Sequence, residues 1–274
     1  MIITMHGFVT MYSNLKTDIR IASETGYEAL EILASKLIRY LDLGFEMDEL
    51  DSLFKKYSIK PVCINCLLNI ERVHPKEHEE LLSEAERLCK AASIIGCPTI
   101  QLVALCGLES KSWPEILKHT SKNITEIADI GKNYKVRFQL EPIAWSPINS
   151  LSKSLEVLDK VNRDNVGLVI DFWHLYAGEK SNPEEVSKLD SSLIYGVHFC
   201  DGIKHKEGTK WVEGDLRQYL PGEGEVQIKD WVKAVKSTGF DGVYSAELLS
   251  PKHWEWDHLE IAREAKKRME DYIL

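Results

Sequence analysis

The chain of 274 residues lacks the features that would place it in a membrane or on nucleic acid. No apolar run approaches the roughly 20 residues that a helix needs to span a bilayer. Residues 1–10 contain no basic region, apolar core and small-residue cleavage site of the kind found in secretory signals. Acidic residues outnumber basic ones by 43 to 34, and the resulting net charge of −9 disfavours a phosphate-backbone partner. We therefore expect a cytoplasmic protein with no membrane or nucleic-acid partner.

The cysteines lack the spacing of a structural metal site. The six cysteines are Cys63, Cys66, Cys89, Cys97, Cys106 and Cys200. Only the first two have C-x-x-C spacing, and no second such pair completes a structural zinc site. Several of the six lie inside predicted strands or helices, where cysteine behaves as a small hydrophobic residue. The sequence therefore predicts reduced, structural cysteines.

No segment has the composition of a linker, and no short repeat is present. Instead, apolar strand-like runs alternate with amphipathic segments such as 79–96 and 120–134. Gly96 and Gly131 are expected to end or follow these helices as C-caps. The predicted strands are Ile2–His6, Ala29–Leu33, Pro61–Asn65, Thr99–Ala104, Val136–Glu141, Val166–Asp171, Ile194–Phe199 and Gly242–Leu248.

These strands are nearly continuous apolar runs, which is typical of a parallel sheet buried on both faces. Eight strands in a chain of this length favour a closed barrel over an open sheet. We therefore predict an α/β fold, a single (β/α)8 TIM barrel over residues 1–274. In that fold functional residues lie at the C-terminal ends of the strands.

Four polar residues lie at the ends of the last four predicted strands: Glu141, Asp171, His198 and Glu247. Parallel strands deliver these side chains to the same end of the barrel. Three carboxylates beside one imidazole would repel each other without a cation among them. Carboxylate oxygens with one imidazole nitrogen suit Mg²⁺, Mn²⁺, Co²⁺ or Zn²⁺. The sequence therefore predicts a site for one divalent metal ion.

Two further residues follow these strand ends by three positions. His174 comes after Asp171 and beyond the strand, so we expect it to face a substrate. Asp201 follows His198, and it either orients a ligand, contacts substrate or caps a loop.

Other polar and aromatic side chains are expected around the barrel mouth. His6 and Asn65 end the first and third strands. Glu31, in the second strand, either faces the mouth or is a carboxylate satisfied inside the barrel. Trp145 and Trp173 follow strands five and six, where their rings either pack on a sugar or cyclitol ring or cover the mouth.

The motifs around these residues resemble the xylose-isomerase-like barrel superfamily of sugar isomerases and epimerases. Within it, the second half of the chain looks most like bacterial inosose isomerases of inositol catabolism. The matching segments are LEP at 140–142, VNRDNVGLVIDFWH at 161–174, VHFCD at 197–201, PGEGE at 221–225 and SAELLSP at 245–251.

The resemblance implies a keto-sugar, inosose or other polyol ketone as substrate. It also implies that Glu141, Asp171, His198 and Glu247 bind the metal, and that Glu141 and Glu247 act as the acid/base pair. A metal on the ketone and its neighbouring hydroxyl acidifies the carbon-bound proton between them, and the proton moves through an enediolate. The residue matching His174 binds a substrate oxygen in such enzymes.

One position departs from the family pattern. The family often carries an arginine three residues before the Pro-Gly of the PGxG turn, whereas this chain has Gln218 there and Arg217 one residue earlier. Slack in the loop would allow Arg217 to reach the same place, so we predict that it binds substrate.

Other functions share parts of this pattern. Lyases and dehydratases on the same scaffold start with the same proton abstraction and then expel a β-substituent. An endonuclease-IV-like repair enzyme needs more histidine ligands, and a non-catalytic sugar-binding barrel is expected to have lost a ligand or base. Helix surfaces such as 231–240 are compatible with a homo-oligomer.

Overall fold

The computed structural model describes residues 1–105, 107–108, 110–178 and 180–274. Its centre is a closed barrel in which each strand pairs in parallel with the next and β8 pairs with β1, as predicted. The strands are β1 (Ile2–His6), β2 (Ala29–Leu33), β3 (Lys60–Leu68), β4 (Thr99–Val103), β5 (Arg137–Glu141), β6 (Val166–Asp171), β7 (Ile194–Phe199) and β8 (Val243–Ala246).

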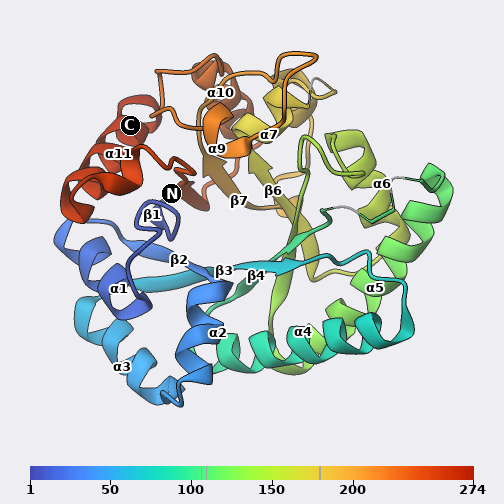
Figure 1. Cartoon of the computed structure of the whole chain (residues 1–274), viewed down its shortest axis with the longest axis horizontal. Coiled ribbons are helices and arrows are strands. Elements are labelled where there is room, and N and C mark those ends of the chain that lie inside the picture. The colour runs from blue at the N-terminus through green and yellow to red at the C-terminus, as the bar shows by residue number, and fades with distance from the viewer. Residues whose placement is uncertain (106, 109, 179) are drawn as a thin grey trace.

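Helices surround the barrel, and α11 at the C-terminus packs against α1, β1 and β8 (Figure 1). The longer helices are α1 (Leu15–Glu24), α2 (Ala34–Asp42), α3 (Met47–Tyr57), α4 (Pro75–Ile95), α5 (Trp113–Tyr134), α6 (Leu151–Val161), α10 (Ile228–Ser237) and α11 (His258–Ile273). The short ones are α7 (Phe172–Ala177), α8 (Pro183–Val186), α9 (Glu213–Leu216) and the 3-10 turns η1 (Ser191–Leu193) and η2 (His253–Glu255).

The strands form because their side chains are buried on both faces. Every residue of β2, β4 and β6 is buried, with the barrel interior on one face and the helices on the other. The helices turn apolar stripes toward this sheet, and most of the buried apolar side chains of strands and helices join one continuous core. The C-terminal ends of the strands are therefore held on a rigid frame.

The two glycines predicted to be C-caps behave differently. Gly96 caps α4 in the left-handed conformation with φ +69°, as predicted. Gly131 lies inside α5, which continues to Tyr134 and is capped by Lys135 at φ 59°. A Cβ on Gly131 would come within 2.3 Å of the Phe138 ring, so this glycine allows α5 to approach β5 closely. The prediction of a C-cap at Gly131 was wrong because close packing, not chain reversal, selects glycine there.

The structure also bears on the cysteines and on the question of membrane-spanning helices. Cys63, Cys66, Cys89, Cys97 and Cys200 are free thiols. Cys106 lies outside the described residues. Within the described part of the chain, no helix combines the length and the hydropathy needed to cross a membrane.

A buried ion pair fixes the loop that follows β1. Lys36, at the start of α2, places its Nζ 2.8 Å from the Asp18 carboxylate and donates to the Thr10 carbonyl at 2.7 Å. Asp18 also accepts from the hydroxyls of Thr10 and Ser13. Both charged side chains are buried, so each depends on the other for compensation. This cluster ties residues 7–14, beside the barrel mouth, to α1 and α2.

We expect Lys36→Met to lower the free energy of unfolding by about 3–5 kcal/mol, because it leaves the Asp18 carboxylate buried without its cation. Urea denaturation monitored by circular dichroism measures this change. The double variant Lys36→Met/Asp18→Leu removes both charges and should recover most of the loss. A single variant within about 1 kcal/mol of the parent would contradict this interpretation.

Candidate metal centre

Four buried side chains converge at the C-terminal ends of β5 to β8. Glu141 and Asp171 are the last residues of β5 and β6, His198 lies in β7, and Glu247 directly follows β8. Each offers one ligand atom, and these atoms all lie within 4.8 Å of one another. His198 Nδ1 lies 2.9 Å from Glu141 Oε1, 3.6 Å from Asp171 Oδ2 and 3.7 Å from Glu247 Oε2. One imidazole nitrogen therefore faces three carboxylates.

Local structure holds two of the carboxylates in place. Asp171 is also the N-cap of α7, and its Oδ1 accepts a 2.6 Å hydrogen bond from the backbone N–H of His174. Inside the barrel, Gln139 donates to Gln101, which in turn donates to Glu141 Oε2 at 2.8 Å. The Glu141 carboxylate is thus oriented by a chain of amides that starts two residues earlier in β5.

The carboxylates of this cluster change the pKa of the His198 imidazole. Burial alone would lower the pKa of its imidazole, but the charges of Glu247 and Glu31 and hydrogen bonds that the ring donates to the Asp171 and Glu141 carboxylates raise it well above the usual value. Without a metal, the ring is therefore an imidazolium among carboxylates. A divalent cation that takes the Nδ1 lone pair replaces that proton.

The pKa values of two neighbouring carboxylates are shifted in opposite directions. Burial opposes ionisation of Asp171, but its electrostatic interactions with His174 and Arg217 outweigh burial and hold the pKa of Asp171 well below its usual range. For Glu141 burial is the larger effect, and its pKa is raised. Two nearby carboxyl groups with pKa values shifted in opposite directions suit different roles, one as a permanent anion and the other as an exchanger of protons.

The donor set fits a divalent metal ion. Three carboxylate oxygens and one imidazole nitrogen match the ligands that Zn²⁺ and Mn²⁺ accept, and among the described residues this cluster contains no cysteine, unlike a closed structural zinc site. The four residues that the sequence singled out are thus brought together by the fold. Their role as ligands remains a prediction.

Arg217 enters this site from the end of α9. Its Nη2 donates to Asp171 Oδ2 at 3.3 Å and also to Glu247 Oε2, while Nη1 donates to Glu213 at 2.9 Å. The loop therefore places Arg217 at the metal-ligand cluster although its position in the sequence differs from the family pattern. Contact with substrate remains a prediction.

His174 lies beside Arg217. Its Nε2 is 3.3 Å from Arg217 Nη1, and its Nδ1 accepts from the backbone N–H of Ala144 at 3.3 Å. The ring is buried at the edge of the cluster, in agreement with its predicted place beyond the strand end.

Two further candidates, Trp173 and Asp201, contact other groups of the protein. Trp173 is fully buried; it donates to the Ile203 carbonyl at 3.1 Å, and the Arg217 guanidinium lies 5.1 Å from the centre of its ring. It supports Arg217 and does not offer a free ring face, because α7 turns it inward. Asp201 accepts from the backbone N–H groups of Gly222 and Gly224 at 2.8 and 3.0 Å, and from those of residues 202 and 226. Its carboxylate anchors the PGEGE loop, which is the loop-cap alternative.

The remaining candidates line the mouth. Trp145 is 39% exposed and donates to Glu213 at 3.3 Å, so it lies at the rim. Asn65 donates to Glu31 at 3.2 Å. His6 is fully buried, and its Nε2 points between Glu31 and Glu247, at 3.8 and 3.5 Å. These three remain predicted substrate contacts.

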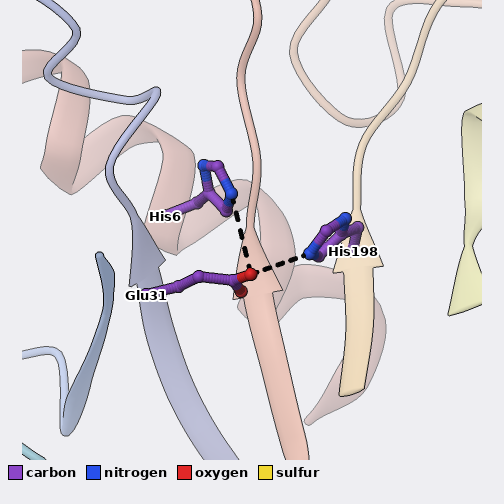
Figure 2. A group of neighbouring side chains, drawn as sticks. All are labelled: His6, Glu31 and His198. Carbon is purple, nitrogen blue, oxygen red and sulfur yellow. Dashed lines mark hydrogen bonds and ion pairs between the residues drawn. The ribbon is translucent and has the colours of Figure 1, made fainter. Parts of the chain in front are cut away.

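Glu31 is the residue whose role the sequence left open. Its carboxylate lies between His6 and His198, with Oε1 3.1 Å from His198 Nε2 (Figure 2). The sequence indicated only that Glu31 lies in a predicted buried strand. No motif links it to His198, which is 167 residues away in the chain.

The chain is a (β/α)8 barrel with a cluster of carboxylates and histidine at its strand ends. This combination is typical of barrels suited to metal-assisted chemistry. The family model for the xylose isomerase-like TIM barrel matches residues 19–272. The chain therefore belongs to the xylose isomerase-like TIM barrel family.

Relatives within this family cover nearly the whole chain. An inosose isomerase of Bacillus subtilis (strain 168) is 30% identical over 270 residues, which is 95% of this chain and 93% of the relative. An inosose isomerase of Bacillus velezensis is 28% identical, over 95% of this chain and 92% of the relative. A crystal structure of IolI protein with a zinc atom superimposes with a TM-score of 0.92 at 29% identity, covering 100% of this chain and 98% of that one.

Proposed function

We propose that this protein is a divalent-metal-dependent isomerase or epimerase of an inosose or related keto-sugar. The observation that carries the proposal is the convergence of Glu141, Asp171, Glu247 and His198 Nδ1 at the barrel mouth. The inosose isomerases among its relatives favour a cyclic polyol ketone as substrate. The zinc atom in the similar IolI structure favours a metal-loaded site.

The proposed ligands are Glu141, Asp171, His198 and Glu247. When bound, a divalent cation supplies Lewis-acid polarisation of a carbonyl and stabilises the negative charge that develops on its oxygen. Asp171 is suited to remain an anion, since His174 and Arg217 hold its pKa low. Glu141 is suited to exchange a proton, since burial raises its pKa.

The proton path uses the two glutamates. One of Glu141 and Glu247 takes the proton from the carbon beside the carbonyl, and that carboxylate becomes a carboxylic acid. If a proton returns to the former carbonyl carbon, and the hydroxyl proton passes to the former carbonyl oxygen, the carbonyl has moved by one carbon and the isomer results. Return of a proton to the opposite face of the carbon that lost it gives the epimer. In both cases the reaction is redox-neutral overall and needs no co-substrate.

Three other side chains are suited to orient the substrate. The guanidinium of Arg217 and the ring of His174 lie at the edge of the cluster. His6 accepts the Phe8 backbone N–H at Nδ1, which leaves its Nε2–H as a donor directed past Glu247. Burial is the main reason that the pKa of His6 is lowered, so this ring is a neutral donor.

Solvent deuterium uptake followed by NMR tests the proposal. The protein loaded in turn with Zn²⁺, Mn²⁺, Mg²⁺ or Co²⁺ is incubated in D₂O with a panel of inososes and ketoses. We expect metal-dependent label at the carbon beside the carbonyl, together with an isomer or epimer as product. A product that has lost water would identify a lyase instead. Absence of metal binding under all conditions would refute the proposed site.

We further propose that the chain acts as a single barrel domain in the cytoplasm, on a small-molecule polyol ketone. The closed barrel formed by β1 to β8, with α11 packed on both end strands, supports a single domain. The free thiols suit a reducing compartment.

A further inference from the structure

Glu31 is a buried carboxylate surrounded by hydrogen-bond donors from other strands. Its Oε1 accepts from Asn65 Nδ2 at 3.2 Å and lies 3.1 Å from His198 Nε2. Its Oε2 accepts from the Ser245 hydroxyl at 2.5 Å. These contacts come from β3, β7 and β8, so the carboxylate is fixed on three sides. The Asn65 amide and the Ser245 hydroxyl both act as donors to this carboxylate.

The two nitrogens of His198 face different surroundings. Nδ1 points at Glu141, Asp171 and Glu247, whereas Nε2 points into the barrel at Glu31. A neutral imidazole carries a proton on only one nitrogen, and a metal binds the other one. A metal at Nδ1 therefore requires the proton at Nε2, where the Glu31 carboxylate accepts it.

His6 limits the alternatives for Glu31. Because its Nδ1 accepts from the Phe8 N–H at 3.1 Å, its proton lies on Nε2, which is 3.8 Å from Glu31 Oε1 (Figure 2) and 3.5 Å from Glu247 Oε1. A second cation bound by His6, Glu31 and His198 would have to displace that proton and also remove the remaining proton from His198. Glu31 is thus placed to accept the N–H of His198 at 3.1 Å, with the N–H of His6 3.8 Å away, rather than to act as a ligand.

We propose that Glu31 is a positioning residue for the metal centre: it holds His198 in the Nε2–H tautomer with Nδ1 aimed at the metal. The inference rests on the proposed function, because it concerns the metal-binding side of that same site. Carboxylates that accept the second ring N–H of a histidine ligand orient the ring and increase its basicity, and their loss typically weakens metal binding 10- to 100-fold.

Two substitutions of Glu31 distinguish the effect of its hydrogen-bond acceptor on Zn²⁺ binding from the effect of its negative charge. Glu31→Leu removes the acceptor, and we expect about 10- to 100-fold weaker Zn²⁺ binding in competition with a chelator, without substrate. Glu31→Gln keeps a carbonyl oxygen toward His198 and should lose less than Glu31→Leu does. Thr4→Val, a nearly isosteric change of another fully buried polar side chain inside the barrel, is the matched control and should bind Zn²⁺ like the parent.

NMR of the ¹⁵N-labelled, zinc-loaded protein supplies a readout that a general loss of stability would not produce. In the parent, His198 should show one slowly exchanging N–H proton, on Nε2. In Glu31→Leu this signal should exchange faster or disappear, whereas Glu31→Gln should retain it. Thermal unfolding of the metal-free variants checks that each is folded. If the leucine variant does not fold, zinc binding and the N–H signal are compared between the parent and the conservative glutamine variant.

The outcomes distinguish this inference from the function on which it depends. If the parent protein binds no metal, the proposed function fails and this inference fails with it. If the parent binds Zn²⁺ and folded Glu31→Leu binds it within about twofold, Glu31 does not position His198 although the metal site stands. A proton found on Nδ1 of His198 in the zinc-loaded parent would also overturn the inference.

Discussion

Replacement of Glu247 by glutamine is expected to lower the rate of deuterium exchange into substrate by about 10²- to 10⁴-fold, the usual contribution of a positioned acid or base. The amide keeps the size of the side chain but cannot take up a proton from carbon. It also weakens one of the three anionic ligands, so the assay is run at saturating Mn²⁺ with bound metal measured in the same sample. Proton NMR in D₂O follows the label.

Glu141→Gln should give a loss of similar size, since the two carboxylates are proposed to share the proton transfer. Glu225→Gln makes the same charge change in the loop that follows β7, outside the metal-ligand cluster, and serves as the control. If Glu247→Gln with metal bound exchanged label at the parent rate, Glu247 would not be an acid or base. If only one of the two glutamates mattered, a single residue would carry both proton steps.

Removal of the metal is expected to abolish exchange and to reduce thermal stability. Three carboxylates converge on this site, and the positive charges nearest to them in the metal-free protein belong to His198 and Arg217. A cation that binds only the folded state adds about 2.7 kcal/mol at a free concentration 100 times its dissociation constant. We expect the unfolding temperature to fall by several degrees after dialysis against a chelator, as measured by differential scanning calorimetry.

Addition of Zn²⁺, Mn²⁺, Co²⁺ or Mg²⁺ in turn should restore both stability and activity, and the order of recovery ranks the metals. His198→Asn, which lacks the imidazole ligand, is the matched comparison and should show a smaller metal-dependent shift in unfolding temperature. Full exchange activity in chelator-treated protein, verified to be metal-free, would refute metal-dependent chemistry at this site.

Two side chains that follow strand ends show what sequence position leaves open. For Trp173 the alternatives were packing on a sugar ring and covering the mouth. For Asp201 they were orienting a ligand, contacting substrate and capping a loop. The structure turns Trp173 inward beneath Arg217 and engages Asp201 with the backbone N–H groups of the PGEGE loop. Side-chain direction in a turn depends on the backbone path after the strand, which local sequence patterns specify poorly.

Arg217 is a residue that reaches the site although its spacing in the sequence differs from the family pattern. The family spacing put its role in doubt, because Gln218 occupies the usual position. The turn after α9 carries Arg217 to Asp171 and Glu247 nevertheless. One residue of register in a loop is absorbed by loop conformation, whereas one residue in a strand would have moved the side chain to the other face of the sheet.

The sequence by itself determined the barrel, its eight strands and the four residues at the ends of strands five to eight. Strand formation follows from continuous apolar runs, and parallel pairing brings all strand ends to one edge, so the convergence of Glu141, Asp171, His198 and Glu247 needed no further information. Only the tertiary structure decided the partner of each site residue. Glu31 meets His198 because the barrel closes β1 onto β8 and places distant strands face to face across its interior. Such contacts depend on the closure and register of the whole barrel, which no local pattern of residues encodes.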